Sequence, residues 1–200
     1  GVERADLEDL LVPGLDAHRA VLVNGRFVAS LSDLGDLPAG VRAGGLGALL
    51  ASDPDAIEGR LNRVTGDGVH VFSALNTAGL DDGFVLLIEE GVKVERPIEL
   101  IHLSVGMDEP RVAQPRHLID LAPGAQASIA ERYVSLGESL YCTNSVLEVT
   151  LGRGAALEHA RIQLESPNAY HIGGFYLSQG EGSRYKGVNI GLGAAWARTD

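Results

Sequence analysis

His159 has the surroundings that come nearest to a metal-binding motif in this sequence. Gly154 precedes it, and Arg161 follows it with one residue between them. Alternate residues of a β-strand point to the same face, so a His-x-His pair could hold one metal ion. Arg161 stands where the second histidine would be, and a guanidinium stays protonated and cannot bind a metal. We therefore expect His159 to be a structural residue at a corner of the chain, hydrogen-bonded to the backbone.

The other residues that could bind a metal lie far apart along the chain. We interpret Cys142 as a small core residue at the start of a strand, because no histidine lies near it in the sequence. His171 is interpreted as structural, and His102 and His117 as strand residues without partners. The sequence therefore assigns no catalytic, cofactor-binding or metal-binding residue.

Two common catalytic signatures are absent from the sequence. A P-loop needs a lysine directly after a glycine, to meet the charge of the phosphates. Neither Lys93 nor Lys186 follows a glycine, and the chain has no other lysine. The Gly-x-Ser-x-Gly pattern of many hydrolases does not occur either. We therefore expect a protein that is not an enzyme by itself.

The composition excludes several classes of partner. Sixteen basic residues against 27 acidic residues give a net charge of −11, which a phosphate backbone would repel. The longest apolar stretches are far shorter than the roughly 20 residues of a membrane-spanning helix. The single cysteine allows no intrachain disulfide. These features favour a cytoplasmic protein that binds neither nucleic acid nor membrane.

The first 80 residues are expected to form a mixed α/β segment. Asn24-Gly25 lies between two apolar runs and predicts a tight hairpin over residues 20–28, because both residues tolerate positive φ. Asp53 before Pro54 predicts the start of a short helix, with Asp53 as its N-cap. Residues 72–80 predict another short helix, with Leu75 and Ala78 facing inward.

From Phe84 onward, apolar and polar residues alternate with a period of two, which is typical of β-strands. A similar turn recurs at Gly91, Gly124, Gly154 and Gly182, at spacings of 124 − 91 = 33, 154 − 124 = 30 and 182 − 154 = 28. Repeats of this length indicate stacked supersecondary units, none of which can bury its own apolar face. We predict a mainly β protein in which residues 81–200 form a right-handed parallel β-helix.

The alternation changes phase within the third unit. Leu147, Val149 and Leu151 share one face, and Ala155 and Leu157 continue it after the turn. A second apolar set then follows at alternate positions, which would mark a corner or a bulge. The residues predicted to face inward after this change of phase are Ala160, Ile162 and Leu164.

A set of short motifs follows in order along the chain, at residues 74–78, 82–84, 91–98, 115–118, 124–127, 131–133, 144–145, 157–163 and 183–184. This ordered set is similar to the SufB/SufD family of iron–sulfur cluster assembly proteins. The similarity spans nearly the whole chain, and the segment Val23–Phe27 is more like the SufD branch than the SufB branch.

The resemblance implies a scaffold subunit of an assembly complex. It implies pairing with a homologous SufB-like β-helix subunit and binding of a SufC-like ATPase, and a homodimer is an alternative. No cofactor is expected on this chain by itself, whereas an iron–sulfur cluster would belong to the full complex. Nothing after Ala195 resembles a cap for a β-helix, so we expect the chain to be part of a longer protein.

Two enzymatic alternatives remain open from the sequence. A cupin-like metal-dependent enzyme centred on His159 would predict a bound metal and two packed sheets in place of stacked coils. A carbohydrate-active β-helix enzyme would need a cleft with paired acids or aromatic platforms, and aromatic residues make up only 5% of the chain.

Overall fold

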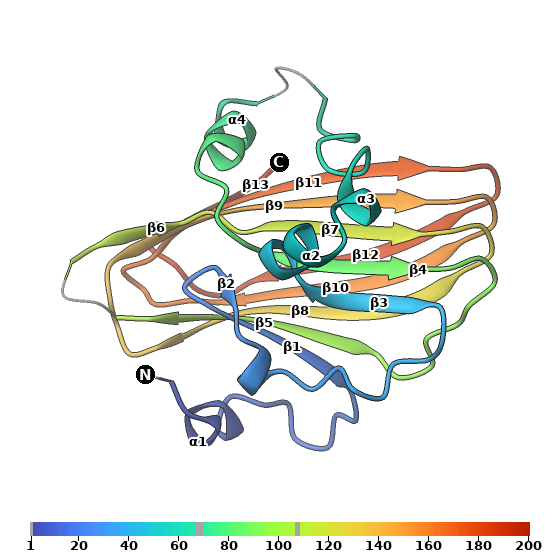
Figure 1. Cartoon of the computed structure of the whole chain (residues 1–200). Coiled ribbons are helices and arrows are strands. Elements are labelled where there is room, and N and C mark those ends of the chain that lie inside the picture. Colours follow the sequence, from blue (N-terminus) through green and yellow to red (C-terminus); the bar gives the residue numbers. More distant parts are fainter. Residues whose placement is uncertain (1, 67–69, 107–108) are drawn as a thin grey trace.

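The computed structural model describes residues 2–66, 70–106 and 109–200, and Figure 1 shows the whole chain. No helix within these residues is long and apolar enough to cross a membrane. The helical elements are α1 (Arg4–Glu8), the 3-10 helix η1 (Ala29–Leu31), α2 (Leu46–Ser52), α3 (Pro54–Ile57) and α4 (Val71–Ala78). The strands are β1 (His18–Val23), β2 (Arg26–Phe27), β3 (Val41–Gly45), β4 (Phe84–Ile88), β5 (Ile98–Val105), β6 (Arg111–Ala113), β7 (Arg116–Leu121), β8 (Gln126–Leu136), β9 (Tyr141–Leu151), β10 (Ala156–Leu164), β11 (Tyr170–Gln179), β12 (Arg184–Gly191) and β13 (Trp196–Thr199).

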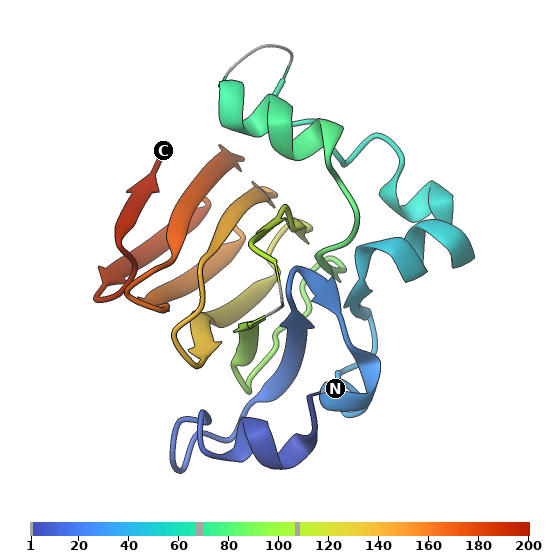
Figure 2. The same cartoon turned by 90° about the vertical axis from the view of Figure 1, so that its left-hand side faces the viewer.

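The strands form a parallel β-solenoid of about four coils, which confirms the predicted fold class. One sheet has the order β12-β10-β8-β5-β1-β2, and the other has the order β13-β11-β9-β7-β4-β3. From β7 onward the chain passes from one sheet to the other after each strand, and every strand from β7 to β12 pairs in parallel with its counterpart in the preceding coil. Figure 2 looks along the strands and shows the coils side by side.

The repeated glycines lie where the prediction placed them. All four have positive φ, from 68° to 73°, which a residue with a Cβ adopts only at a cost. The turns stack at the right-hand end of Figure 1. The amides of Gly91, Gly124 and Gly154 donate to the carbonyls of Pro123, Arg153 and Glu181 in the next coil, each at 2.9 Å. The turns therefore continue the ladder between coils and fix their register.

The N-terminal segment covers the first coil. The hairpin is confirmed, because β1 and β2 pair antiparallel around Asn24 and Gly25, both of which have positive φ. β1 also pairs in parallel with β5, and β3 pairs antiparallel with β4, so the segment extends both sheets. A division into units at residue 80 stays a prediction. α3 begins at Pro54 as expected, but the Asp53 carboxylate pairs with Arg42 and does not cap the helix.

The interior of the solenoid is apolar near the glycine turns and polar toward the opposite end. Leu147, Val149 and Leu151 join residues of the facing sheet in one apolar cluster, as the alternation predicted. Ala155 and Leu157 belong to the same cluster after the turn. Burying such aliphatic layers stabilises the fold by roughly 1.5–3 kcal/mol for each large side chain.

The predicted change of phase along β10 is wrong. Ala160, Ile162 and Leu164 do not face inward, and Leu164 is 43% exposed. The strand keeps one alternation throughout. The residues that follow Leu157 into the interior are polar: His159, Arg161, Gln163 and Glu165. Hydropathy cannot reveal this arrangement, because these side chains are buried by pairing with one another.

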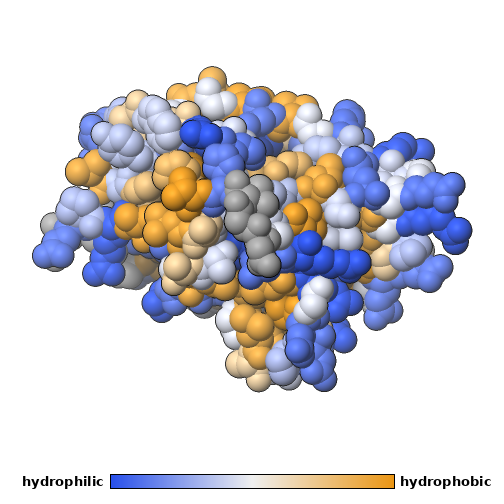
Figure 3. Space-filling model, turned by 90° about the horizontal axis from the view of Figure 1, so that it is seen from above, coloured by the Kyte–Doolittle hydropathy of each residue, from blue (hydrophilic) through white to orange (hydrophobic). Residues whose placement is uncertain are grey.

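The helix predicted over residues 72–80 is confirmed as α4, but the prediction of which residues face inward is wrong. Leu75 is 50% exposed and Ala78 is exposed, whereas Asn76 on the opposite face is completely buried. The Asn76 amide donates to the carbonyls of Pro115 at 3.0 Å and Asn144 at 2.8 Å. The helix therefore lies on the outer face of the sheet through its polar side. Figure 3 looks down on this side of the molecule, where apolar and polar side chains are interspersed.

A buried ion pair on the sheet also binds residues 62–65, the segment that leads to α4. Arg116 and Glu148, on neighbouring strands β7 and β9, lie 2.7 Å apart at their nearest atoms, and both are essentially unexposed. Glu148 also accepts the amides of Asn62, Val64 and Thr65, which precede α4. Each charge is thus surrounded by hydrogen-bonding partners, as a buried ion pair requires.

Replacing one glycine of the stacked turns should destabilise the fold. Gly124→Ala forces a side chain into the left-handed region, which costs about 1–2 kcal/mol, and urea unfolding measures this loss. Gly35→Ala is the matched control, because an added Cβ there meets nothing within 4 Å and the φ of Gly35 is not positive. Equal stabilities of the two variants would contradict the role assigned to the turn.

Removing one partner of the buried Arg116–Glu148 pair should lower the free energy of unfolding more than the glycine substitution does. Arg116→Met leaves the Glu148 carboxylate buried without its cation, and we expect a loss of about 3–5 kcal/mol in the free energy of unfolding. Arg60→Met, which breaks the partly exposed pair with Asp120, should cost no more than about 1 kcal/mol. A loss for Arg116→Met as small as that for Arg60→Met would show that the pair is not needed.

Candidate functional site

The polar half of the solenoid interior gathers four of the six histidines of the chain. His102, His117, His159 and His171 come from β5, β7, β10 and β11, and none is more than 6% exposed. The ring centroids of His102 and His117 lie 4.8 Å apart, so the prediction that these two residues lack partners is wrong. Tyr133 lies between His102 and His171. Its ring centroid is 4.0 Å from that of His102 and 4.6 Å from that of His171.

Glu131 is the centre of this cluster. Its Oε1 accepts the hydroxyl of Tyr133 at 2.7 Å and lies 3.2 Å from His102 Nε2. Its Oε2 lies 3.0 Å from His159 Nε2 and 3.9 Å from Arg161 Nε. Burial alone would raise the pKa of Glu131, but the close approach of His102, the hydrogen bond with His159 and the charge of Arg161 outweigh it and hold the pKa well below its usual range. Glu131 is therefore a carboxylate inside the protein.

His159 does not occupy the corner that its sequence context predicted. It lies within β10, is 5% exposed, and bonds to side chains and not to the backbone. Because the Glu131 carboxylate can only accept, the proton of the neutral His159 ring lies on Nε2. Nδ1 then accepts the hydroxyl of Tyr185 at 3.1 Å. Tyr185, His159 and Glu131 form a continuous hydrogen-bonded chain.

Glu165 is a second carboxylate in the polar part of the interior, and it contacts His171 and Thr143. Glu165 Oε2 lies 2.6 Å from His171 Nδ1, and Glu165 Oε1 accepts the hydroxyl of Thr143 at 3.0 Å. Arg161 donates to the other nitrogen of His171. His171 thus links Arg161 to Glu165, and its interpretation as a structural residue stays a prediction.

The donor atoms of His102, His117 and Glu131 lie within 4.8 Å of one another and resemble a metal site in composition. The hydrogen bonding of His117 argues against it. The Phe84 amide donates to His117 Nδ1 at 3.0 Å, so the proton of the neutral ring lies on Nε2. A histidine that binds a metal donates its second nitrogen to an acceptor, which is the opposite arrangement. These three residues do not fit a metal ion.

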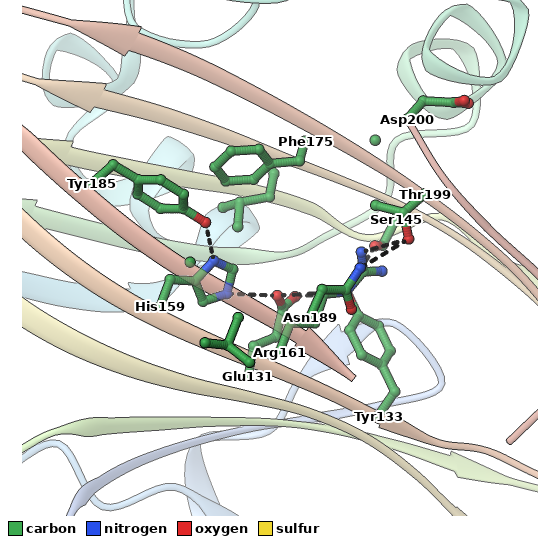
Figure 4. Close-up of a pocket in the computed structure, with 14 residues that line it drawn as sticks. Glu131, Tyr133, Ser145, His159, Arg161, Phe175, Tyr185, Asn189, Thr199 and Asp200 are labelled. Atoms are coloured by element: carbon green, nitrogen blue, oxygen red, sulfur yellow. Dashed lines mark hydrogen bonds and ion pairs between the residues drawn. The ribbon is translucent and has the colours of Figure 1, made fainter. Parts of the chain in front are cut away.

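A cavity of about 380 Å³ opens beside the Glu131 cluster (Figure 4). Tyr185, His159 and Arg161 contribute its polar groups, and Phe175 and Leu147 its apolar wall. The volume lies within the range of roughly 300–1,000 Å³ that small-molecule sites occupy.

His159 has both ring nitrogens engaged by protein groups, and the strands form stacked coils. The cupin-like alternative, which predicted packed sheets around a metal at His159, therefore finds no support in the fold.

Cys142 lies outside this interior. It is half-buried at the start of β9, in a groove of about 350 Å³ near Tyr141 and Val112, so its interpretation as a core residue is wrong. Burial, followed by the charge of Glu165, raises the pKa of its thiol. A thiol with a raised pKa is less often the nucleophilic thiolate.

Two family models match consecutive parts of the chain. The SufBD protein N-terminal region matches residues 6–100, and the SufBD core domain of the SUF system for iron–sulfur cluster assembly matches residues 103–200. The fold defines the class of the protein, a parallel β-solenoid preceded by a small segment of helices and strands. The chain belongs to the SufBD family of iron–sulfur cluster assembly proteins, as its motifs predicted.

Curated relatives agree with this assignment. An iron–sulfur cluster assembly SufBD family protein of Synechocystis is 34% identical over 97% of the chain and 44% of its own length. Protein ABCI7 of Arabidopsis thaliana, described as chloroplastic, is 34% identical over 90% of the chain and 38% of its own length. SufD of Escherichia coli is 28% identical over 82% and 36%, which is consistent with the SufD branch. The chain thus spans less than half the length of these relatives.

Sequence reasoning missed Glu131, Tyr133 and Arg161 as members of one site. Glu131 and Tyr133 were identified only as part of a family motif, and Arg161 only as the residue that stands in place of the second histidine of a metal-binding motif. One available signal was their alternation: Glu131 and Tyr133, like His159 and Arg161, are two residues apart on strands whose apolar residues continue the same face.

Titration of the buried histidines should make stability depend on pH. Burial, reinforced by His102, lowers the pKa of His117 well below 6.5. As the pH falls below about 6.5, the unfolded chain takes up a proton that the folded chain excludes, so the free energy of unfolding decreases until the folded pKa is reached. His117→Asn keeps an acceptor for the Phe84 amide but cannot titrate. Urea unfolding from about pH 8 to about pH 5 should show a slope shallower by up to about 1.4 kcal/mol per pH unit; identical slopes would contradict this assignment.

Proposed function

We propose that the protein containing this chain is a scaffold subunit of an iron–sulfur cluster assembly complex. It pairs with a homologous SufB-like β-helix subunit and is coupled to a SufC-like partner ATPase. The observation that carries the proposal is the match of both SufBD family models, in order, over residues 6–100 and 103–200 of one solenoid. The iron–sulfur cluster is the cargo of the complex, and cytoplasmic location is part of the proposal.

Mechanical features of the fold support a scaffold role. Each coil is tied to the next by a continuous parallel ladder and by the glycine-turn hydrogen bonds. The buried Arg116–Glu148 pair holds the helical segment against the sheet. A body joined in this way can pass a displacement from one end to the other. The sequence has no P-loop, which supports nucleotide hydrolysis in a partner.

Co-purification of the full-length protein tests the proposal. Tagged full-length protein, expressed together with the homologous β-helix subunit and the ATPase of the same organism, should elute with both at fixed stoichiometry, as measured by light scattering after gel filtration. An unrelated parallel β-helix protein with the same tag is the control and should bring down neither. A monomer that elutes alone at micromolar concentrations of both partners would refute the proposal.

A further inference from the structure

The apolar side chains of α4 face away from the protein. Val71, Ala74, Leu75 and Ala78 follow the spacing i, i+3, i+4 and i+7, which places them on one face of the helix, here called the α4 stripe. Val71 is 72% exposed, Leu75 is 50% exposed, and both alanines are exposed. Figure 1 shows α4 outside the sheet, at the top of the molecule. Apolar side chains that gather on one exposed face, unlike scattered ones, mark interaction sites.

The polar side of α4 fixes this orientation. The Asn76 amide is completely buried and donates to the carbonyls of Pro115 and Asn144. Ser73 bonds to the hydroxyl of Tyr176 on β11. A rotation of the helix that buried the α4 stripe would break these bonds and leave buried polar groups without partners. The contacts beneath the helix therefore hold the stripe at the surface.

The shape of the α4 stripe suits a second helix. The eight residues of α4 extend over ~12 Å. Ala74 and Ala78 lie beside the larger Val71 and Leu75, so the face has both low and raised positions. Helices pack by fitting the ridges of one into the grooves of the other. An extended peptide would instead need unpaired backbone groups at a sheet edge, which a helix face does not offer.

The surrounding charge indicates the chemistry of the partner. α4 contains no charged residue, whereas residues 46–82 contain two basic and six acidic residues, 2 − 6 = −4. Asp81 follows the C-terminal end of α4, where the helix dipole is also negative, and its side chain remains 57% exposed beside Arg26. These charges favour lysine or arginine on the partner. A second copy of the chain would bring the same negative charges, and α4 lacks the basic residues of a membrane-surface helix.

We propose that the α4 stripe docks an amphipathic helix of a partner protein, whose apolar face is flanked by lysine or arginine. The apolar residues of that helix cover Val71 and Leu75, and its basic residues lie near Asp81. This surface is separate from the polar interior and from the stacked glycine turns. It adds a docking function to the proposed scaffold role and does not depend on the pairing with a second β-helix subunit.

Two fluorescent synthetic peptides test the proposal. Each is a helix of about 18 residues, long enough to form in isolation, with leucine and alanine along one face. Lysines flank that face in the first peptide, and glutamates flank it in the second. Fluorescence anisotropy with the full-length protein should show saturable binding of the lysine peptide, and binding of the glutamate peptide weaker by at least about tenfold. No binding of the lysine peptide, or equal binding of both, would overturn the proposal.

Variants locate the binding on the α4 stripe. The double variant Val71→Gln with Leu75→Gln changes only exposed positions and should weaken binding of the lysine peptide by at least about tenfold. Val12→Gln is the control, because Val12 is also exposed, at 39%, but follows α1 on the opposite side of the molecule (Figure 1). It should bind as the wild type does. Circular dichroism checks that the variants are folded, and unaltered binding by the double variant would refute the assignment.

Other occupants of the α4 stripe give distinct results. In full-length protein carrying Leu75→Cys and Cys142→Ser, a fluorescent maleimide should label the new thiol as fast as it does in urea. Protection would show that the rest of the same protein covers the stripe. A dimer that the double variant abolishes, seen by light scattering, would assign the stripe to a second copy. Sedimentation with phosphatidylcholine–phosphatidylglycerol vesicles would assign it to a membrane. Each of these three results would overturn the proposal, and none bears on co-purification with the scaffold partners.

Discussion

An ionised carboxylate inside a protein needs hydrogen-bond donors, and this requirement organises the solenoid. Glu131 is satisfied only because β5, β8 and β10 place His102, Tyr133 and His159 around it. Glu148 is satisfied only because Arg116 and the segment before α4 meet it on the outer face. Both carboxylates therefore depend on the relative positions of several coils. A shift of one coil by one residue would leave buried charges unpaired, at a cost of several kcal/mol.

The two halves of the interior therefore have different roles. The aliphatic half near the glycine turns supplies stabilisation that depends little on which apolar residues meet. The polar half supplies specificity, because its hydrogen bonds are directional and most of its groups have one suitable partner.

The amino-acid sequence by itself determined the repeat. Glycine adopts positive φ at little cost, so the recurrence of Gly91, Gly124, Gly154 and Gly182 indicated the turns, and all four have positive φ in the structure. Period-two apolar runs then gave the strands, and the ordered motifs gave the family. The inward faces of β10 and α4 were misjudged, because hydropathy assigns His159, Arg161 and Asn76 to the surface. Only the tertiary structure decided that they are buried, since partners distant in sequence, such as Glu131 and Arg116, compensate their desolvation.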